Sequence, residues 1–244
     1  MQALRKMELA VENIAHARTL TGLGLWPALG IAGILAVCIL QISDLSPAHA
    51  QGAGNEGIFR SIETKSSNLG PFKKWTGAME RFTEEKAKEE KRQDCDTQKF
   101  NTCHYHLWKK FLDSLRGKPK DVLIEDVNNW ANQRNYITDP KNWGEEDYWE
   151  TPGEFIARFG DCEDYAIIKY LSLRDLGFTD DELRVVAVKD LNLKVGHAIL
   201  VVYHGGKALL LDNQIKKVVD TAIVRHYEPV FSINRSFWWR HRLS

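Results

Sequence analysis

Two adjacent glycines constrain the fold of this chain more than any other feature. Gly205-Gly206 separates two apolar runs, 197–204 and 207–213. A two-residue glycine connection between such runs predicts a tight β-hairpin. The turn also sets the pairing of the strands, with His204 opposite Lys207 and the pairs continuing outward from there. The C-terminal half is therefore expected to contain an antiparallel strand pair of defined register.

The same register brings a histidine close to an aspartate. Asp212 faces Ile199 across the hairpin, and His197 lies two residues further along, on the same face as Ile199. Diagonal neighbours of this kind are about 7–8 Å apart at the backbone, which is within side-chain reach. A carboxylate that orients an imidazole is what a cysteine nucleophile requires. The alternative is that His197 is a core histidine with satisfied hydrogen bonds and Asp212 a turn residue.

The order of the other elements predicts an α+β domain. Apolar residues at helical spacing precede Gly177, and strand-like patterns follow it. Residues 58–77 are expected to be irregular or strand-like, Asp121 can cap one helix, and Thr151 with Glu154 forms a capping box. The expected helices span 79–93, 107–115, 121–131, 154–159 and 162–177, and the expected strands span 183–188, 197–204, 207–213 and 229–239.

The composition favours a folded protein that does not bind nucleic acid. Hydrophobic residues make up 43% of the 244 residues and include eight tryptophans, which is enough for a sizeable core. A disordered scaffold is therefore excluded. Basic and acidic residues number 33 each, so the net charge is zero, and no basic stripe with interleaved aromatic residues indicates a nucleic-acid surface.

The first fifty residues resemble a signal peptide. Basic residues precede an uncharged run over about 20–42, and the run ends in Ser46-Pro47-Ala48-His49-Ala50. This small-x-small pattern predicts cleavage after Ala50, so residues 1–50 are the expected signal and 51–244 the expected single domain. The apolar run is also long enough to span a bilayer, so an uncleaved inner-membrane anchor is the alternative. In both cases the body of the protein lies outside the cytoplasm.

An odd number of cysteines remains once Cys38 leaves with the signal. Cys95, Cys103 and Cys162 then leave one thiol free in an exported protein. Cys95 and Cys103 would be roughly 12 Å apart along one straight helix, which is too far for a disulfide. A bridge between them therefore requires the chain to bend near 96–98. A zinc site that uses the neighbouring His104 and His106 is a further alternative, although the spacing matches no usual ligand pattern.

The third cysteine lies among carboxylates, in the sequence Gly160-Asp161-Cys162-Glu163-Asp164. This segment is the expected first turn of a helix, where unpaired N–H groups and the helix dipole favour a thiolate. The acids oppose the thiolate unless a cation binds among them, so the pattern indicates both a nucleophile and a metal. The alternative is that the acids only stabilise the helix N-terminus, by less than about 1 kcal/mol each.

The sequence resembles the bacterial transglutaminase-like cysteine proteinases in three places. These are the segment 160–166, a histidine on the next long strand, and Leu211-Asp212-Asn213 after a hairpin. The resemblance is strongest to the LapG-type periplasmic proteases that release adhesins. It also includes the segments 143–152 and 232–238, and it covers roughly residues 100–240. It implies a papain/transglutaminase-like α+β fold, in which the nucleophile helix packs on an antiparallel β-sheet after N-terminal helices.

The resemblance also implies roles for particular residues. The family's Cys-His-Asp triad falls on Cys162, His197 and Asp212. The family's calcium ligands flank the cysteine and correspond to Asp161 and Glu163. Asp139, in the preceding turn, is a further candidate ligand, and Asp164 is a weaker one. Carboxylate oxygens at a junction between a loop and a helix suit Ca²⁺ chemically.

The implied activity is hydrolysis of a peptide bond through an acyl-enzyme. Members of the family cut between two alanines in the membrane-proximal retention module of a large adhesin, which disperses a biofilm. An inner-membrane receptor for cyclic-di-GMP restrains them through its periplasmic domain. Two alternatives remain open, a transglutaminase or amidase that uses the same triad on glutamine side chains, and a non-catalytic module that binds calcium and a partner.

Overall fold

The computed structural model describes residues 57–89 and 102–243. The expected signal peptide with its cleavage site, as well as Cys38 and Cys95, lie outside the described residues. None of the helices in the described ranges has the length and apolarity that crossing a bilayer requires.

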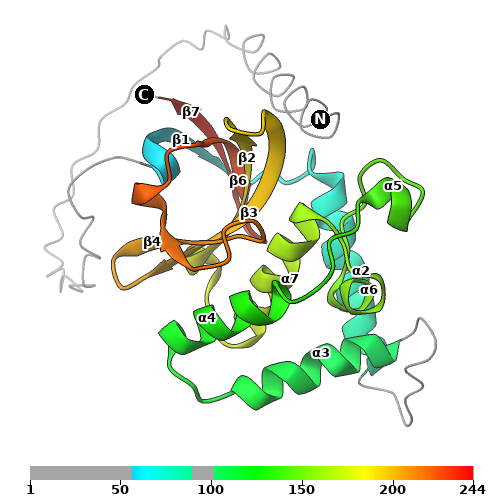
Figure 1. Ribbon diagram of the computed structural model, residues 1–244. Coiled ribbons are helices and arrows are strands. Elements are labelled where there is room, and N and C mark those ends of the chain that lie inside the picture. Colours follow the sequence, from blue (N-terminus) through cyan, green and yellow to red (C-terminus); the bar gives the residue numbers. More distant parts are fainter. Residues whose placement is uncertain (1–56, 90–101, 244) are drawn as a thin grey trace, which may run out of the picture.

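In the described residues, six α-helices follow the first strand along the sequence and precede the other strands (Figure 1). They are α2 (Lys73–Glu89), α3 (Thr102–Leu115), α4 (Lys120–Ala131), α5 (Asp139–Asn142), α6 (Pro152–Arg158) and α7 (Cys162–Asp175). Short 3₁₀ turns complete the described helical structure, η1 (Ile58–Arg60), η2 (Asp180–Glu182) and η3 (Thr221–Ile223). The prediction that helices precede most of the strands is thus confirmed.

Several helix boundaries differ from the sequence prediction, among them the start of α3, which lies at Thr102 rather than at 107. Helix α2 begins at Lys73 rather than at 79, although Gly77 weakens a helix. Its first turns bury Trp75 and Ala78, and this packing outweighs the glycine. The cap of α4 is Pro119 rather than Asp121, because the Pro119 carbonyl already accepts a hydrogen bond from the N–H of Leu123 at 3.0 Å.

The helical spacing of apolar residues in α3 predicts a buried face with Trp108, Leu112 and Leu115, and these three residues are buried. Leu107 was expected on the apolar face but is 40% exposed. Tyr105, which the spacing did not single out, is buried as well. The Trp108 indole donates to Ser172 Oγ of α7 at 2.8 Å, and this bond fixes which side of α3 meets α7.

All the strands within residues 57–89 and 102–243 form one antiparallel sheet. The strands are β1 (Ser61–Ser66), β2 (Leu183–Asp190), β3 (Val195–His204), β4 (Lys207–Leu211), β5 (Val219–Asp220), β6 (Tyr227–Ile233) and β7 (Trp238–Leu243). Their order in the sheet is β1-β7-β6-β2-β3-β4-β5. In the β3–β4 hairpin His204 pairs with Lys207 and Leu200 with Leu211, which confirms the register that the two glycines predicted.

The predicted strand 229–239 is in fact two strands with a turn between them. The Asn234 side chain accepts hydrogen bonds from the N–H groups of Ser236 and Phe237, at 2.9 and 2.8 Å. Short polar side chains that bond to the backbone in this way terminate strands and nucleate turns. The turn reverses the chain, so β7 pairs with both β6 and β1.

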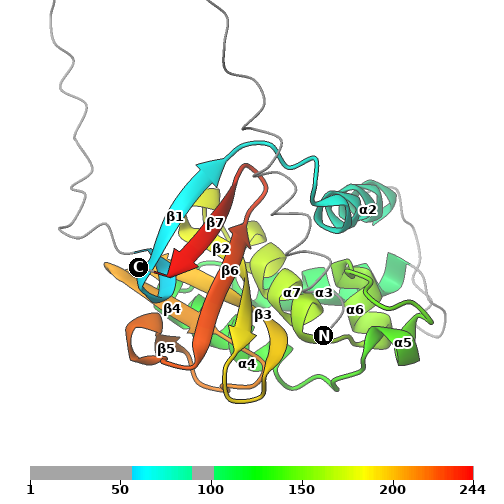
Figure 2. The same ribbon diagram turned by 90° about the horizontal axis from the view of Figure 1, so that it is seen from above.

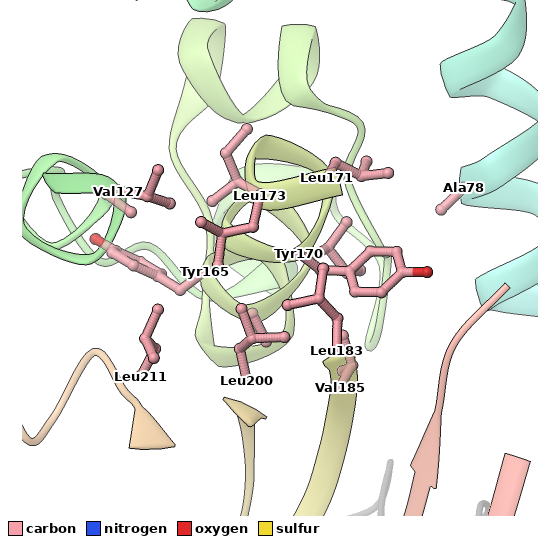
Figure 3. Close-up of a cluster of buried hydrophobic side chains, with 14 of the residues drawn as sticks. Ala78, Val127, Tyr165, Tyr170, Leu171, Leu173, Leu183, Val185, Leu200 and Leu211 are labelled. Carbon is pink, nitrogen blue, oxygen red and sulfur yellow. The ribbon is translucent and has the colours of Figure 1, made fainter. Parts of the chain in front are cut away.

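Helix α7 lies at the centre of the core. The helices cover one face of the sheet (Figure 2), and α7 is enclosed by α2, α4 and the strands. Figure 3 shows Ala78 of α2, Val127 of α4 and Leu200 of β3 around this helix. A helix that is buried on nearly all sides has little room to shift. The first residue of α7 is therefore held firmly against the sheet.

The opposite face of the sheet has a smaller core of its own. Val186, Val188 and Ile199 point to this side and pack with Ile58 and Tyr227. Alternate residues of β2 and β3 thus belong to different cores, as the two-residue period of a strand requires. This second core brings Tyr227 of β6 close to the predicted histidine.

Candidate active site

The chain makes a sharp bend just before Cys162. Phe159 has a positive φ of 63°, and the Gly160 carbonyl accepts a hydrogen bond from Ile137 N–H at 3.0 Å. A Cβ added at Gly160 would meet Asp164 Oδ2 at 2.2 Å. The same Asp164 oxygen accepts from Asp161 N–H at 3.0 Å. The bend and this bond place Cys162 at the first position of α7, as predicted.

His197 and Asp212 are joined by a direct hydrogen bond. His197 Nε2 lies 2.8 Å from Asp212 Oδ1, and both residues are at most 2% exposed. Asp212 also accepts from Tyr227 Oη at 2.7 Å and from Gln214 N–H at 2.9 Å. These bonds hold the pKa of Asp212 below its ordinary value despite the opposing effect of burial. Asp212 is therefore a carboxylate with a fixed orientation toward the imidazole.

Cys162 and His197 line one cavity of about 380 Å³. Gly196 and Ala198 of β3 form part of the same wall, and the N–H of Ala198 is directed at the thiol. The structure thus brings all three predicted triad residues together, two at the cavity and Asp212 directly behind His197. Cys162 is also a free cysteine.

The acids next to the thiol form a cluster that extends beyond the predicted ligands. Carboxylate oxygens of Asp139, Asp161 and Asp164 lie within 4.8 Å of one another, as do those of Asp139, Asp147 and Glu163. The predicted ligands Asp161, Glu163 and Asp139 are therefore neighbours in space. Asp147 was not predicted as a ligand, although it lies in the segment that carries the family resemblance.

Burial and mutual repulsion raise the pKa values of these acids, which favours their protonated forms. The pKa of Asp139 rises to about 7, first because the group is buried and then because of Asp161 and Asp147. The pKa of Glu150 rises to about 8, chiefly through burial, and burial and nearby carboxylates raise those of Asp161, Glu163 and Asp164. Such a cluster binds either protons or a cation.

The donor set fits a hard cation. Asp139 Oδ1 and Asp161 Oδ1 are buried and have no hydrogen-bond partner among the described residues. Several carboxylate oxygens at one point are the ligands that Ca²⁺ prefers. Asp139, Asp147, Asp161 and Glu163 are accordingly the residues that could hold the ion.

The same acids also affect the thiol. Burial raises the pKa of Cys162 well above its ordinary value, and Glu163 and Asp161 raise it further. The thiol donates to Glu163 Oε2 at 3.0 Å. A cation bound to these acids would remove much of their repulsion and favour the thiolate. Binding of a cation at these carboxylates would therefore be coupled to activation of the thiol.

The other cysteine in the described ranges, Cys103, is disulfide-bonded. The sequence left open whether Cys103 pairs with Cys95, and Cys95 lies outside the described residues. A cysteine in a disulfide has no thiolate to offer to zinc, and this argues against the alternative zinc site with His104 and His106.

Tyr227 is a residue that the sequence prediction missed. Its hydroxyl bonds to Asp212 Oδ2 across the smaller core, yet the two residues lie on different hairpins. The only available sequence signal was a tyrosine at the start of an apolar strand, and that pattern does not distinguish a hydrogen-bonded tyrosine from a packed one.

A family model described as bacterial transglutaminase-like cysteine proteinase matches residues 86–228. The chain belongs to this family. This protein is also similar to a solved structure of Legionella pneumophila LapG. The two chains share 34% sequence identity, and the TM-score is 0.53 over 65% of this chain and 87% of that chain.

A calcium-bound form of Legionella pneumophila LapG gives the same identity and TM-score over 67% of this chain and 91% of that one. An EGTA-treated form gives a TM-score of 0.54 at 34% identity, over 66% and 86%. A search of curated proteins found no match. The family and these structures establish that the chain is a cysteine protease with the transglutaminase-like α+β fold.

Proposed function

We propose that this protease is a calcium-dependent endopeptidase in which Cys162 is the nucleophile, His197 the base and Asp212 the residue that orients it. The observation that carries the proposal is the bond between His197 and Asp212 behind the cavity that also holds Cys162. Papain-like and transglutaminase-like enzymes need this combination, a thiol at a helix start and an imidazole held by an acid.

The hydrogen bonds assign a task to each ring nitrogen. Nε2 carries the proton that His197 donates to Asp212, so Nδ1 is left to accept the thiol proton. The sulfur then attacks the scissile carbonyl, and the oxyanion is stabilised by the backbone N–H of Cys162. His197 returns its proton to the leaving amine, and a water molecule cleaves the thioester to release the acid and the thiol. Gln214 Nε2, 3.4 Å from Nδ1, supports this ring orientation.

Calcium belongs to the proposal because the acids around Cys162 are buried together. Asp161 and Glu163, with Asp139 and Asp147, would hold the ion. When bound, it supplies positive charge that offsets these carboxylates beside the thiol. The existence of a calcium-bound form of the similar Legionella pneumophila LapG supports this assignment.

The proposed substrate is a large surface adhesin, cut between two alanines near its N-terminal retention module, so that the adhesin leaves the cell and the biofilm disperses. The proposed location is the periplasm, where the periplasmic domain of an inner-membrane receptor for cyclic-di-GMP would restrain the protease. The similarity to Legionella pneumophila LapG supports this proposal.

The direct test is cleavage of an adhesin fragment that contains the retention module. The purified mature protease is expected to cut the fragment in calcium and to stop when EGTA is added. Cys162→Ala should abolish cleavage, and the matched surface variant Glu145→Gln should retain it. An uncut fragment in calcium, or cleavage by Cys162→Ala, would contradict the proposal. Incorporation of an amine into a glutamine peptide would instead favour a transglutaminase.

A further inference from the structure

The first turn of α2 contributes a cation to the acid cluster. Lys74 Nζ forms an ion pair with Asp147 Oδ2 and also donates to the backbone carbonyl of Asp147. The Asp147 side chain is only 8% exposed, whereas that of Lys74 is 45% exposed. The two residues are far apart in sequence, so this contact forms only when α2 packs against the loop that precedes α6. A lysine thus reaches one of the acids that could hold the ion.

Helix α2 itself does not explain this lysine. The helix begins with Lys73 and Lys74 and has no acidic residue in its first turn. Positive charge is unfavourable at a helix N-terminus, because the dipole is positive there. An ion pair with one partly exposed partner also adds little to stability. The contact with Asp147 is therefore the feature that gives Lys74 a role.

Further contacts along α2 hold the loop that carries Asp147. Arg81 donates to the Trp149 carbonyl at 2.5 Å. One turn later, Glu85 accepts a hydrogen bond from Thr151 Oγ1 at 2.6 Å. The segment 147–151 thus follows α2 over several turns. The pair of Lys74 and Asp147 is one of a series of contacts and not an isolated pair on the surface.

Both carboxylate oxygens of Asp147 have donors. Oδ2 faces Lys74, and Oδ1 accepts from the Trp149 indole at 2.9 Å. A carboxylate has further lone pairs, so a metal ion could still share this group. Ligand oxygens of Asp139, Asp147 and Glu163 lie within 4.8 Å of one another, so an ion among them would lie close to the Lys74 ammonium. Two cations at such a carboxylate repel each other.

We propose that Lys74 is a built-in counter-ion that competes with Ca²⁺ for Asp147 and thereby lowers the affinity of the site for calcium. The inference rests on the proposed function, because it concerns control of that same calcium site. Without the ion, the ammonium offsets part of the negative charge of the acids. When the ion binds, the flexible and partly exposed lysine side chain can turn toward solvent. The net charge around a calcium site sets its affinity, so this lysine raises the calcium concentration that the protease needs.

Calcium titration of the purified mature protein tests this competition. By isothermal titration calorimetry at low ionic strength, Lys74→Met should lower the Kd for Ca²⁺ about threefold or more. High salt should narrow the difference, because it screens the repulsion. Lys74→Arg keeps the charge and should leave the Kd within about twofold of the wild type. The matched control Lys73→Met removes an exposed charge from the neighbouring position and should leave the Kd unchanged. An equal or higher Kd for Lys74→Met would overturn the proposal.

A double-mutant cycle tests whether the effect passes through Asp147. In the background of Asp147→Asn, the carboxylate for which the two cations compete is absent. Lys74→Met should then lower the Kd by a clearly smaller factor than it does in the wild type. Equal factors in both backgrounds would indicate that the lysine acts independently of Asp147, and the proposed competition would be wrong.

Melting temperatures separate this inference from the proposed function, because they need no substrate. A ligand that binds more tightly stabilises the folded state more at the same concentration. Calcium should therefore raise the melting temperature of Lys74→Met by more than that of the wild type or Lys73→Met. A larger rise supports the role of Lys74 even if the adhesin is not cut. Equal rises in a wild type that binds calcium and cuts the adhesin would overturn only this role, and a wild type without any rise would overturn both proposals.

Discussion

The hydroxyl of Tyr227 donates a hydrogen bond to Asp212 Oδ2 at 2.7 Å. Strand β6 therefore helps to orient the acid of the candidate triad. Asp212 thereby has partners on both oxygens, because Oδ1 faces His197 Nε2 at 2.8 Å. Tyr227 itself is only 4% exposed and belongs to the smaller core. The orientation of the imidazole thus depends on the packing of both faces of the sheet.

Tyr227→Phe should weaken this arrangement without emptying space in the core. The substitution leaves one oxygen of Asp212 without its donor, at a cost of about 1–2 kcal/mol in the free energy of unfolding. We expect kcat to fall severalfold with little change in KM, measured on the adhesin fragment in calcium. The control Tyr203→Phe, against the same core, should retain full activity. Equal activity of both variants would contradict a role for the Tyr227 hydroxyl.

Gly160→Ala should destabilise the start of α7. The added Cβ would meet Asp164 Oδ2 at 2.2 Å, and Asp164 cannot move away without breaking its bond to Glu150 N–H at 2.8 Å. We expect the free energy of unfolding to fall by about 2 kcal/mol or more, as in an overpacked core. Chemical denaturation measures it.

The matched control for that variant is Gly77→Ala in α2. There the nearest atom to an added Cβ is Arg81 Nη1 at 3.6 Å, which is an ordinary contact. Replacing a glycine inside a helix should stabilise the protein by up to about 1 kcal/mol. If Gly160→Ala were as stable as Gly77→Ala, the close approach at the bend would not be a constraint.

Asp147→Asn should weaken calcium binding. The Asp147 carboxylate lies within 4.8 Å of ligand atoms of Asp139 and Glu163, and an uncharged amide binds Ca²⁺ less strongly than a carboxylate. Isothermal titration calorimetry should give a Kd that is about tenfold higher or more. Glu145→Gln removes an exposed charge two residues away and should leave the Kd unchanged. An equal Kd for both variants would exclude Asp147 from the site.

His241 should make the stability of the protein depend on pH. It is buried between Ser61 Oγ and Ser232 Oγ, at 2.7 and 2.9 Å, and burial lowers its pKa to about 4. The unfolded chain takes up this proton near pH 6.5, so protons favour unfolding below that value. The free energy of unfolding should therefore fall as the pH decreases from about 6.5 to about 4, by up to about 3 kcal/mol.

Replacing His241 with glutamine tests this dependence. His241→Gln keeps a polar side chain between the two serines but does not titrate. Urea denaturation at pH 4.5 and at pH 7.5 should therefore show a smaller difference for the variant than for the wild type. The same difference in both proteins would assign the acid sensitivity to other groups, such as the carboxylates around Cys162.

Local signals were sufficient for much of the site. The glycine pair fixes the β3–β4 register, because a two-residue turn leaves no freedom in pairing, and the register alone placed His197 beside Asp212. The capping box at Thr151 also formed as predicted. The prediction of one strand over 229–239 was wrong, because the apolar pattern continues across the turn at Asn234 and only a side-chain hydrogen bond marks the reversal.

The sequence by itself determined most of the helices, the β3–β4 hairpin and the residue types of the site, since these depend on neighbours along the chain. Only the tertiary structure decided that Tyr227 holds Asp212 and that Asp147 joins the acid cluster. Each of these contacts joins segments that are distant in sequence, and they form only when two hydrophobic cores pack on opposite faces of one sheet. No periodicity within a segment encodes such a contact, because its energy arises from burial shared between segments.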